Sequence, residues 1–168
     1  MTSPRREVQE LLISQMTEHD LLEVVEIEET CGLSRWGWEA YHAELAGDRN
    51  SIMLVARVRS GRDDTSSGQK VKGFIASRII ADELHINNVA VRRPYRRLGV
   101  AKMLLETALN EAASRRARVA FLEVRAGNVP AQLLYERCGF KVTGRRSSYY
   151  TQPLEDALVM SLAIRSSA

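Results

Sequence analysis

The second half of this sequence alternates between strand-like and helix-like segments, and this alternation constrains the fold more than any other feature. Short apolar runs and segments with a helical apolar period take turns from residue 84 to residue 164. Asn128 and Pro130 stand where a helix prefers its cap and its first turn. The expected elements are strands at 84–91 and 119–125, helices at 100–114 and 128–137, and closing strands near 141–148 and 157–164.

Two helices are expected before residue 50. Thr17 and Asp20 resemble a capping box, and the apolar stripe that follows has acids on its other face, so residues 17–29 predict a helix. A second, shorter helix is expected over residues 38–46, because Gly47 then stops the pattern.

The segments SIMLVARV (51–58) and VKGFIASRII (71–80) predict two strands that pair as a hairpin. Residues 59–70 between them are polar and predict a flexible loop, and residues 1–15 predict an N-terminal extension or a first strand. Helices, then a hairpin, then alternating strands and helices predict an α/β (α+β mixed) fold with a mixed central sheet and helices on both faces.

A length of 168 residues fits one domain, residues 1–168, that is large enough to bury its own core. The start, MTSPRREVQE, lacks the apolar core of a signal peptide, and nowhere do about 18 apolar residues run together as a membrane span requires. We therefore expect a cytoplasmic protein without a membrane partner. Cys31 and Cys138 lack metal-ligand spacing and are expected to be buried thiols.

The charge is unevenly distributed along the chain. Residues 1–50 hold 11 acids and 4 bases, whereas the remainder holds 10 acids and 20 bases. A basic half can bind nucleic acid, but aromatic residues make up only 6% and none alternates regularly with the arginines. Nucleic acid is therefore not expected to be the primary partner.

The stretch RRPYRRLGVAK (92–102) packs five cationic residues and no acid between an expected strand and an expected helix. A loop that enters a helix exposes backbone N–H groups at the positive end of the helix dipole, which favours an anion such as phosphate. Gly99 and Ala101 are small where a phosphate would approach the backbone. A solvated helix start is the alternative, because the loop matches neither common phosphate-binding motif.

The segment VAVRRPYRRLGVAKMLL resembles the acetyl-CoA signature of the GNAT acetyltransferases, whose loop [QR]-x-x-G-x-[GA] is matched by Arg96, Gly99 and Ala101. FLEVRAGNVPAQLLYERCGFKVTGRRSSYY, followed by EDALVM, is similar to the bacterial branch that acetylates the N-terminal alanine of a small-subunit ribosomal protein. The resemblance covers about residues 16–164. It implies a mixed, mostly antiparallel sheet of about six to seven strands.

The resemblance also implies a binding site for acetyl-CoA and no metal site. The backbone of the strand before the loop would bind the pantetheine arm and polarise the thioester carbonyl, and the loop amides would wrap the pyrophosphate. Asn128 would contact the cofactor as well, although a plain helix N-cap is its other reading. The implied cofactor residues are Val89, Ala90, Val91, Arg96, Arg97, Leu98, Gly99, Val100, Ala101, Lys102 and Asn128.

Acetyl transfer to an amine needs a base, because a protonated amine has no lone pair. The family places its proton acceptor at the position of Glu123; an outward-facing strand residue that shares a polar face with Arg125 is the alternative. Tyr135, 12 residues further on, matches the family's proton donor to the departing thiolate, and an ordinary half-buried helix tyrosine is its alternative. His85 is expected to be a packed or surface histidine.

The acceptor would lie between residues 30–38 and 147–153, where Trp36, Tyr149 and Tyr150 are the candidate substrate residues. The first of these segments lacks the family's P-x-P-W stretch, which leaves the acceptor open. The acidic first expected helix would favour a cationic amine or a basic peptide tail, or its acids are simply exposed.

The leading prediction is an acetyl-CoA-dependent N-acetyltransferase that acts on the N-terminal α-amine of a protein, of the ribosomal-protein alanine type. The same chemistry on a lysine side chain, a polyamine or another small amine is one alternative. A non-catalytic acyl-CoA-sensing module is another, against which the presence of both Glu123 and Tyr135 argues. The sequence does not predict the oligomeric state.

Overall fold

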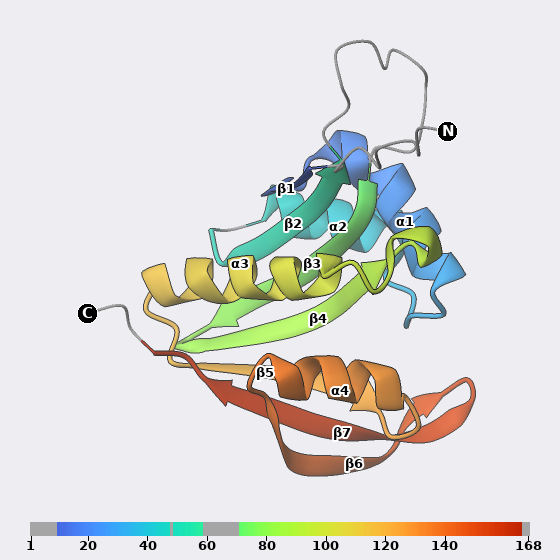
Figure 1. Cartoon of the computed structure of the whole chain (residues 1–168), viewed down its shortest axis with the longest axis vertical. Coiled ribbons are helices and arrows are strands. Elements are labelled where there is room, and N and C mark those ends of the chain that lie inside the picture. Colours follow the sequence, from blue (N-terminus) through green and yellow to red (C-terminus); the bar gives the residue numbers. More distant parts are fainter. Residues whose placement is uncertain (1–9, 48, 59–70, 166–168) are drawn as a thin grey trace, which may run out of the picture.

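The structure is a computed structural model that describes residues 10–47, 49–58 and 71–165. Seven strands form one sheet in the order β1-β2-β3-β4-β5-β7-β6 (Figure 1), and only the β4–β5 pair is parallel. The predicted mixed, mostly antiparallel sheet is therefore confirmed. The strands are β1 (Leu11–Gln15), β2 (Ser51–Val58), β3 (Val71–Ile80), β4 (Glu83–Val91), β5 (Val119–Arg125), β6 (Lys141–Thr151) and β7 (Leu154–Ala163).

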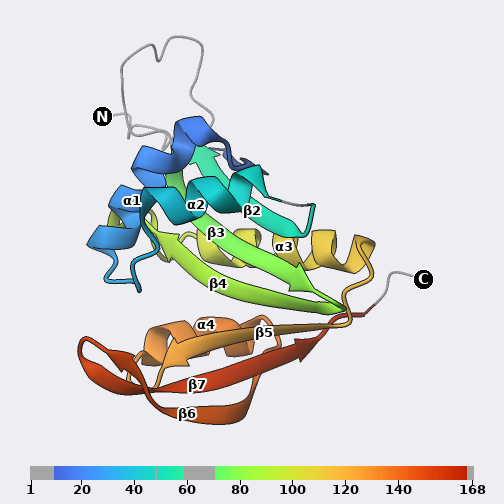
Figure 2. The same ribbon diagram turned by 180° about the vertical axis from the view of Figure 1, so that it is seen from behind.

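Helices cover both faces of the sheet, as predicted. α3 and α4 lie on one face, and α1 and α2 lie on the other face over the N-terminal strands (Figures 1 and 2). Each layer has its own apolar cluster, one around Leu104 and Leu122 and the other around Ile27 and Phe74. The helices are α1 (Leu21–Thr30), α2 (Gly37–Ala46), α3 (Val100–Ser114) and α4 (Val129–Arg137).

The first helical segment begins as the capping box predicts. The Asp20 carboxylate accepts hydrogen bonds from the Thr17 backbone N–H (2.9 Å) and hydroxyl (3.2 Å), and a short 3-10 turn at Glu18–Asp20 leads into α1. Asp20 is buried, and the Arg57 guanidinium compensates its charge at 2.6 Å from Oδ1. This pair ties the start of the helical layer to β2.

The predicted hairpin of β2 and β3 is present, and β1 pairs with the other edge of β2. The loop predicted at residues 59–70 and the first nine residues lie outside the described part of the chain. Among the described helices, none combines the length and the apolar character needed to cross a bilayer.

Strands β4 and β5 pair over only half of their length. Their register runs from Glu83–Val119 to Ile86–Leu122, after which both strands continue without pairing to each other. The register between β3 and β4 shifts next to this point, so Asn87 forms a bulge. Bulges bend a strand and often lie beside active sites. Here the bend separates the ends of β4 and β5.

Candidate active site

A cavity of about 530 Å³ lies where β4 and β5 diverge. Its walls come from both strands, from the loop between α1 and α2, from α4 and from the β6–β7 hairpin. The structure thus brings together residues predicted from separate parts of the sequence. Those that line the cavity are Trp36, Val89, Glu123, Asn128, Tyr135, Tyr149 and Tyr150.

Glu123 occupies the middle of β5, whose residues alternate strictly between half-buried and buried. Its carboxylate oxygen lies 3.4 Å from Nε of Arg146 on β6, and its side chain is 31% exposed. Glu123 and Arg125 share the same face of the strand, and both line the cavity. The half-buried face of β5 therefore borders the cavity. Glu123 can thus share a polar strand face with Arg125 and still be the candidate base.

Tyr135 lies on α4 and packs edge-on against Phe140, with 6.1 Å between the ring centroids. Burial, followed by the neighbouring Tyr150 phenol and the Cys138 thiol, raises the pKa of Tyr135 to about 12. The phenol therefore keeps its proton at neutral pH. A protonated phenol on the wall of the cavity is able to serve as a proton donor.

The β6–β7 hairpin is held against the cavity by Arg125. Its guanidinium donates to the carbonyls of Gln152 and Pro153, both at 3.2 Å, and pairs with Glu155 at 3.3 Å. The same group lies 4.1 Å from the ring centroid of Tyr150. Arg125 therefore positions the tyrosine-bearing end of the hairpin.

The two hairpin tyrosines differ in environment. Their rings meet edge-on at 5.1 Å, but Tyr149 is 48% exposed whereas Tyr150 is half-buried. Burial, followed by Tyr149, raises the pKa of Tyr150 to about 12. The Tyr150 hydroxyl is therefore protonated at neutral pH and available as a hydrogen-bond donor.

The loop before α3 has the backbone geometry of an anion site. Arg97 has φ 62° and Gly99 has φ 79°, a left-handed conformation that favours glycine, and Gly99 is the N-cap of α3. Alternating left-handed residues at a helix N-terminus turn successive N–H groups to one side. A Cβ added at Gly99 would meet no described atom within 4 Å, so the backbone there is open to approach.

Some side chains in and beside this loop make contacts within the protein. The Arg96 guanidinium donates to the Val91 carbonyl at 3.0 Å and lies 3.2 Å from Cys31 Sγ. Val100 is buried in the core, and Ala90 and Val91 are buried on β4. At Val100, Ala90 and Val91 only backbone groups are therefore suited to hold a ligand, and their contact with a cofactor stays a prediction. Asn128 caps α4 through a 3.3 Å bond from the Ala131 N–H, and it also lines the cavity.

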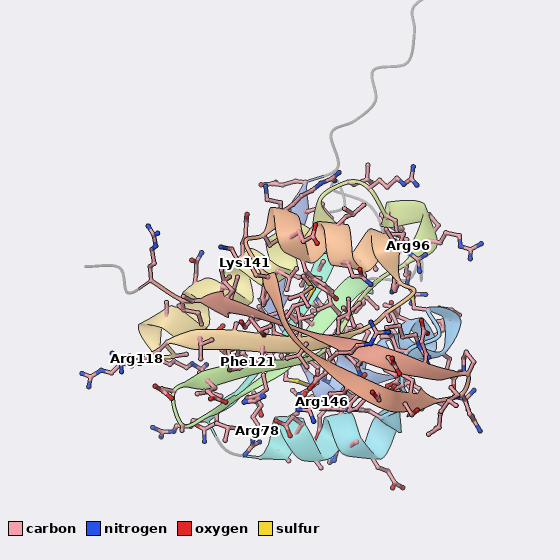
Figure 3. The ribbon with its side chains drawn as sticks, turned by 90° about the horizontal axis from the view of Figure 1, so that it is seen from below. Arg78, Arg96, Arg118, Phe121, Lys141 and Arg146 are labelled. Atoms are coloured by element: carbon pink, nitrogen blue, oxygen red, sulfur yellow. The ribbon has the colours of Figure 1, made fainter. Side chains whose placement is uncertain are left out.

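The predicted burial of the two cysteines needs correction. Cys31 and Cys138 are free thiols, but both are half-buried rather than buried, because Cys31 lies on the cavity wall and Cys138 ends α4. His85 stacks on Phe121, which is labelled in Figure 3, and pairs with Glu83 at 2.8 Å. These contacts agree with the expected packed histidine.

The acids of α1 are not a free anionic surface. Glu23 and Glu26 pair with Arg92, at 3.3 and 3.2 Å, and Glu28 is fully buried. Because these charges are paired or buried, α1 attracts a cationic amine less strongly than its sequence predicts.

Two residues of the cavity region were not predicted from the sequence, Glu28 and Asn88, which are connected through the Tyr41 hydroxyl. Leu21, Val24, Ile27 and Glu28 follow helical spacing, which placed Glu28 on the buried face of α1. Within the described ranges, no group of three or more His, Cys, Asp and Glu is placed to hold a metal.

Residues 17–140 match the family model described as the acetyltransferase (GNAT) family. The [ribosomal protein bS18]-alanine N-acetyltransferase of Salmonella typhimurium is 30% identical to this chain over 154 residues, which are 90% of this chain and 97% of the relative. The crystal structure of the ribosomal-protein-S18-alanine N-acetyltransferase from Escherichia coli superposes with a TM-score of 0.78 at 27% identity, covering 95% of this chain and 97% of that one.

Similarity of fold extends to eukaryotic proteins. Arabidopsis thaliana NAA60, solved in complex with acetyl-CoA, has a TM-score of 0.83 at 21% identity and covers 92% of this chain and 99% of its own. The family match spans most of the sequence and includes the loop before α3, β5 and α4. This chain belongs to the GNAT family of acetyltransferases.

Proposed function

We propose that this chain transfers the acetyl group of acetyl-CoA to the N-terminal α-amine of a protein. The observation that carries the proposal is the cavity in which Glu123 and Tyr135 meet the acceptor-side residues Trp36, Tyr149 and Tyr150. The relatives that act on ribosomal protein bS18 support an alanine terminus and a ribosomal protein as the acceptor. Such an enzyme would act in the cytoplasm, where ribosomal proteins are made.

The described residues fit acetyl-CoA. The backbone amides of residues 97–102, at the N-terminus of α3, suit its pyrophosphate, whereas the Arg96 N–H is bonded to the Arg93 carbonyl at 3.2 Å. The edge of β4 beyond Ile86, which does not pair with β5, suits the amide-bearing pantetheine arm. Val89 lies on this edge and lines the cavity, so its N–H is our candidate donor to the thioester oxygen. Bound acetyl-CoA would supply the activated acetyl group.

The side chains then have two proton-transfer roles. Glu123 takes a proton from the acceptor amine, directly or through a water, and so provides the neutral nucleophile that forms the new amide bond. Tyr135 gives its proton to the sulfur as the carbon–sulfur bond breaks. Glu123 passes the first amine proton to solvent and, after the attack, takes the second proton that the nitrogen loses as the amide forms. Through solvent, that second proton replaces the one that Tyr135 gave to the sulfur, so neither residue is consumed.

The proposed acceptor is tested by measuring acetyl-CoA turnover against peptides that vary at their first two residues. A peptide that begins with alanine and carries no lysine is expected to be a substrate, and mass spectrometry should place the acetyl group on its first residue. The matched control is the same peptide with a blocked N-terminus. Turnover on lysine side chains or polyamines, with none on free N-termini, would contradict the proposal.

Gly99→Val should weaken binding of coenzyme A about tenfold, because a β-branched residue is strained at φ 79° and the loop would rearrange. Isothermal titration calorimetry measures the change. Gly32→Val is the matched control, since Gly32 has φ 66° and is equally open but lies on the acceptor side of the cavity. Parental affinity in a folded Gly99→Val protein would remove the loop from the cofactor site.

A further inference from the structure

Glu28 is a buried carboxylate whose hydrogen bonds end on the acceptor side of the cavity. The side chain is fully buried, and its Oε1 accepts from the Trp36 N–H at 2.6 Å and from the Tyr41 hydroxyl at 2.9 Å. Its Oε2 accepts from the Gly37 N–H at 3.1 Å. A buried charge is tolerated only when hydrogen bonds replace its hydration, and these three bonds do so.

The same carboxylate takes the place of a helix cap. Trp36 is the N-cap of α2, but its side chain does not cap the helix in the described structure. Glu28 instead accepts from the first N–H groups of α2, as an N-cap side chain would. The end of the loop between α1 and α2 is therefore fixed from within α1. Residues 31–34 and Trp36 of this loop line the cavity.

The network continues to the opposite wall. Asn88, 6% exposed on β4, donates from Nδ2 to the Tyr41 oxygen at 2.8 Å, and it lines the cavity beside Val89. Burial and the Glu28 carboxylate raise the pKa of Tyr41, so its hydroxyl keeps its proton and donates to Glu28. The Tyr41 ring also packs 5.3 Å from the Trp36 ring. One chain of contacts thus connects β4 with the acceptor loop.

We infer that Glu28 and Tyr41 are positioning residues that hold the acceptor loop at a set distance from β4 and so determine affinity for the acceptor. The inference rests on the proposed function, because it takes the loop as the acceptor side. Neither residue touches the reacting atoms, and both act through the wall that Trp36 and Asn88 form. Affinity for acetyl-CoA depends on a different segment, the loop before α3.

The kinetic test uses Glu28→Gln and Tyr41→Phe in the full chain with the alanine-terminated peptide. The peptide KM is expected to rise about tenfold in both variants, while kcat and the KM for acetyl-CoA stay within about twofold. Glu29→Gln is the matched control, because it removes the same charge from the next position of α1, where the side chain is exposed. It should leave the peptide KM unchanged.

A second measurement does not depend on the acceptor. Amide hydrogen exchange over residues 31–37 should become about tenfold faster in Tyr41→Phe, which keeps the buried ring, while exchange over residues 119–125 stays at the parental rate. Unchanged exchange over residues 31–37, or a loss confined to kcat, would overturn the inference even if Glu28→Gln failed to fold. A parent enzyme that acetylates no free N-terminus would instead refute the proposed function.

Discussion

Glu123→Gln is expected to lower kcat/KM for the peptide about 10²-fold at neutral pH, because the amide keeps the shape of the carboxylate but accepts no proton. Affinity for acetyl-CoA should be retained, since the loop before α3 is untouched. The loss should shrink as the pH rises, because the acceptor α-amine, with a reference pKa near 8, then deprotonates in solution. Steady-state rates from pH 7 to pH 9.5 measure both effects.

Glu83→Gln is the matched control for this experiment. Glu83 is an acid on β4 that pairs with His85, and its side chain is 41% exposed, close to the exposure of Glu123. It lies opposite Val119, at the closed end of the β4–β5 pair, and does not line the cavity. If both variants lose activity equally, the effect belongs to surface charge. A Glu123→Gln enzyme with the parental rate at neutral pH would exclude Glu123 as the base.

Arg146 forms an ion pair with Glu123, the proposed base. Its guanidinium pairs with the carboxylate from β6, and its side chain is 57% exposed (Figure 3). An exposed ion pair is weak because solvent screens it, so Arg146 should yield to an incoming amine. The pair therefore does not prevent Glu123 from serving as the proposed base.

The elements with strong periodicity were predictable from the sequence, and the geometry between them was not. Residues 100–114 and 119–125 carry apolar patterns that match α3 and β5 to the residue. The bulge at Asn87 left no local signal, because it arises from the register of β4 against β3. The cavity lies beside that bulge, where β4 and β5 diverge, so its volume and its walls depend on geometry that no local sequence pattern carries.

The residues of the candidate site likewise include some that could be predicted from the sequence and some that could not. Glu123 and Tyr135 were assigned through a family resemblance, since an alternating strand alone allowed Glu123 to be an ordinary surface residue. Glu28 was read as one of several acids, although its spacing from Leu21 and Val24 indicated burial. Its connection to β4 could not be found in the sequence, because Tyr41, which bonds to Glu28, and Asn88, which bonds to Tyr41, are 47 residues apart and meet only in the folded chain.

Tyr135→Phe is expected to slow the chemical step by about tenfold to a hundredfold, because it removes the proton donor to the departing thiolate and keeps the ring that packs on Phe140. Affinity for acetyl-CoA should change little. Single-turnover acetylation is the appropriate measurement, because slow product release would hide the loss in kcat. Tyr41→Phe at saturating peptide is the matched control, since it also removes a buried phenol whose pKa is raised but does not touch the reacting atoms.

The pH dependence separates this variant from Glu123→Gln. A pKa of about 12 means that Tyr135 keeps its proton throughout the range from pH 7 to pH 9.5, so the deficit of Tyr135→Phe should be constant there. The deficit of Glu123→Gln should instead fall as the amine loses its own proton. An unchanged single-turnover rate in Tyr135→Phe, or an equal loss in Tyr41→Phe at saturating peptide, would contradict the role of Tyr135 as the acid. A constant deficit for one variant and a falling deficit for the other would assign the two proton transfers to different side chains of one cavity.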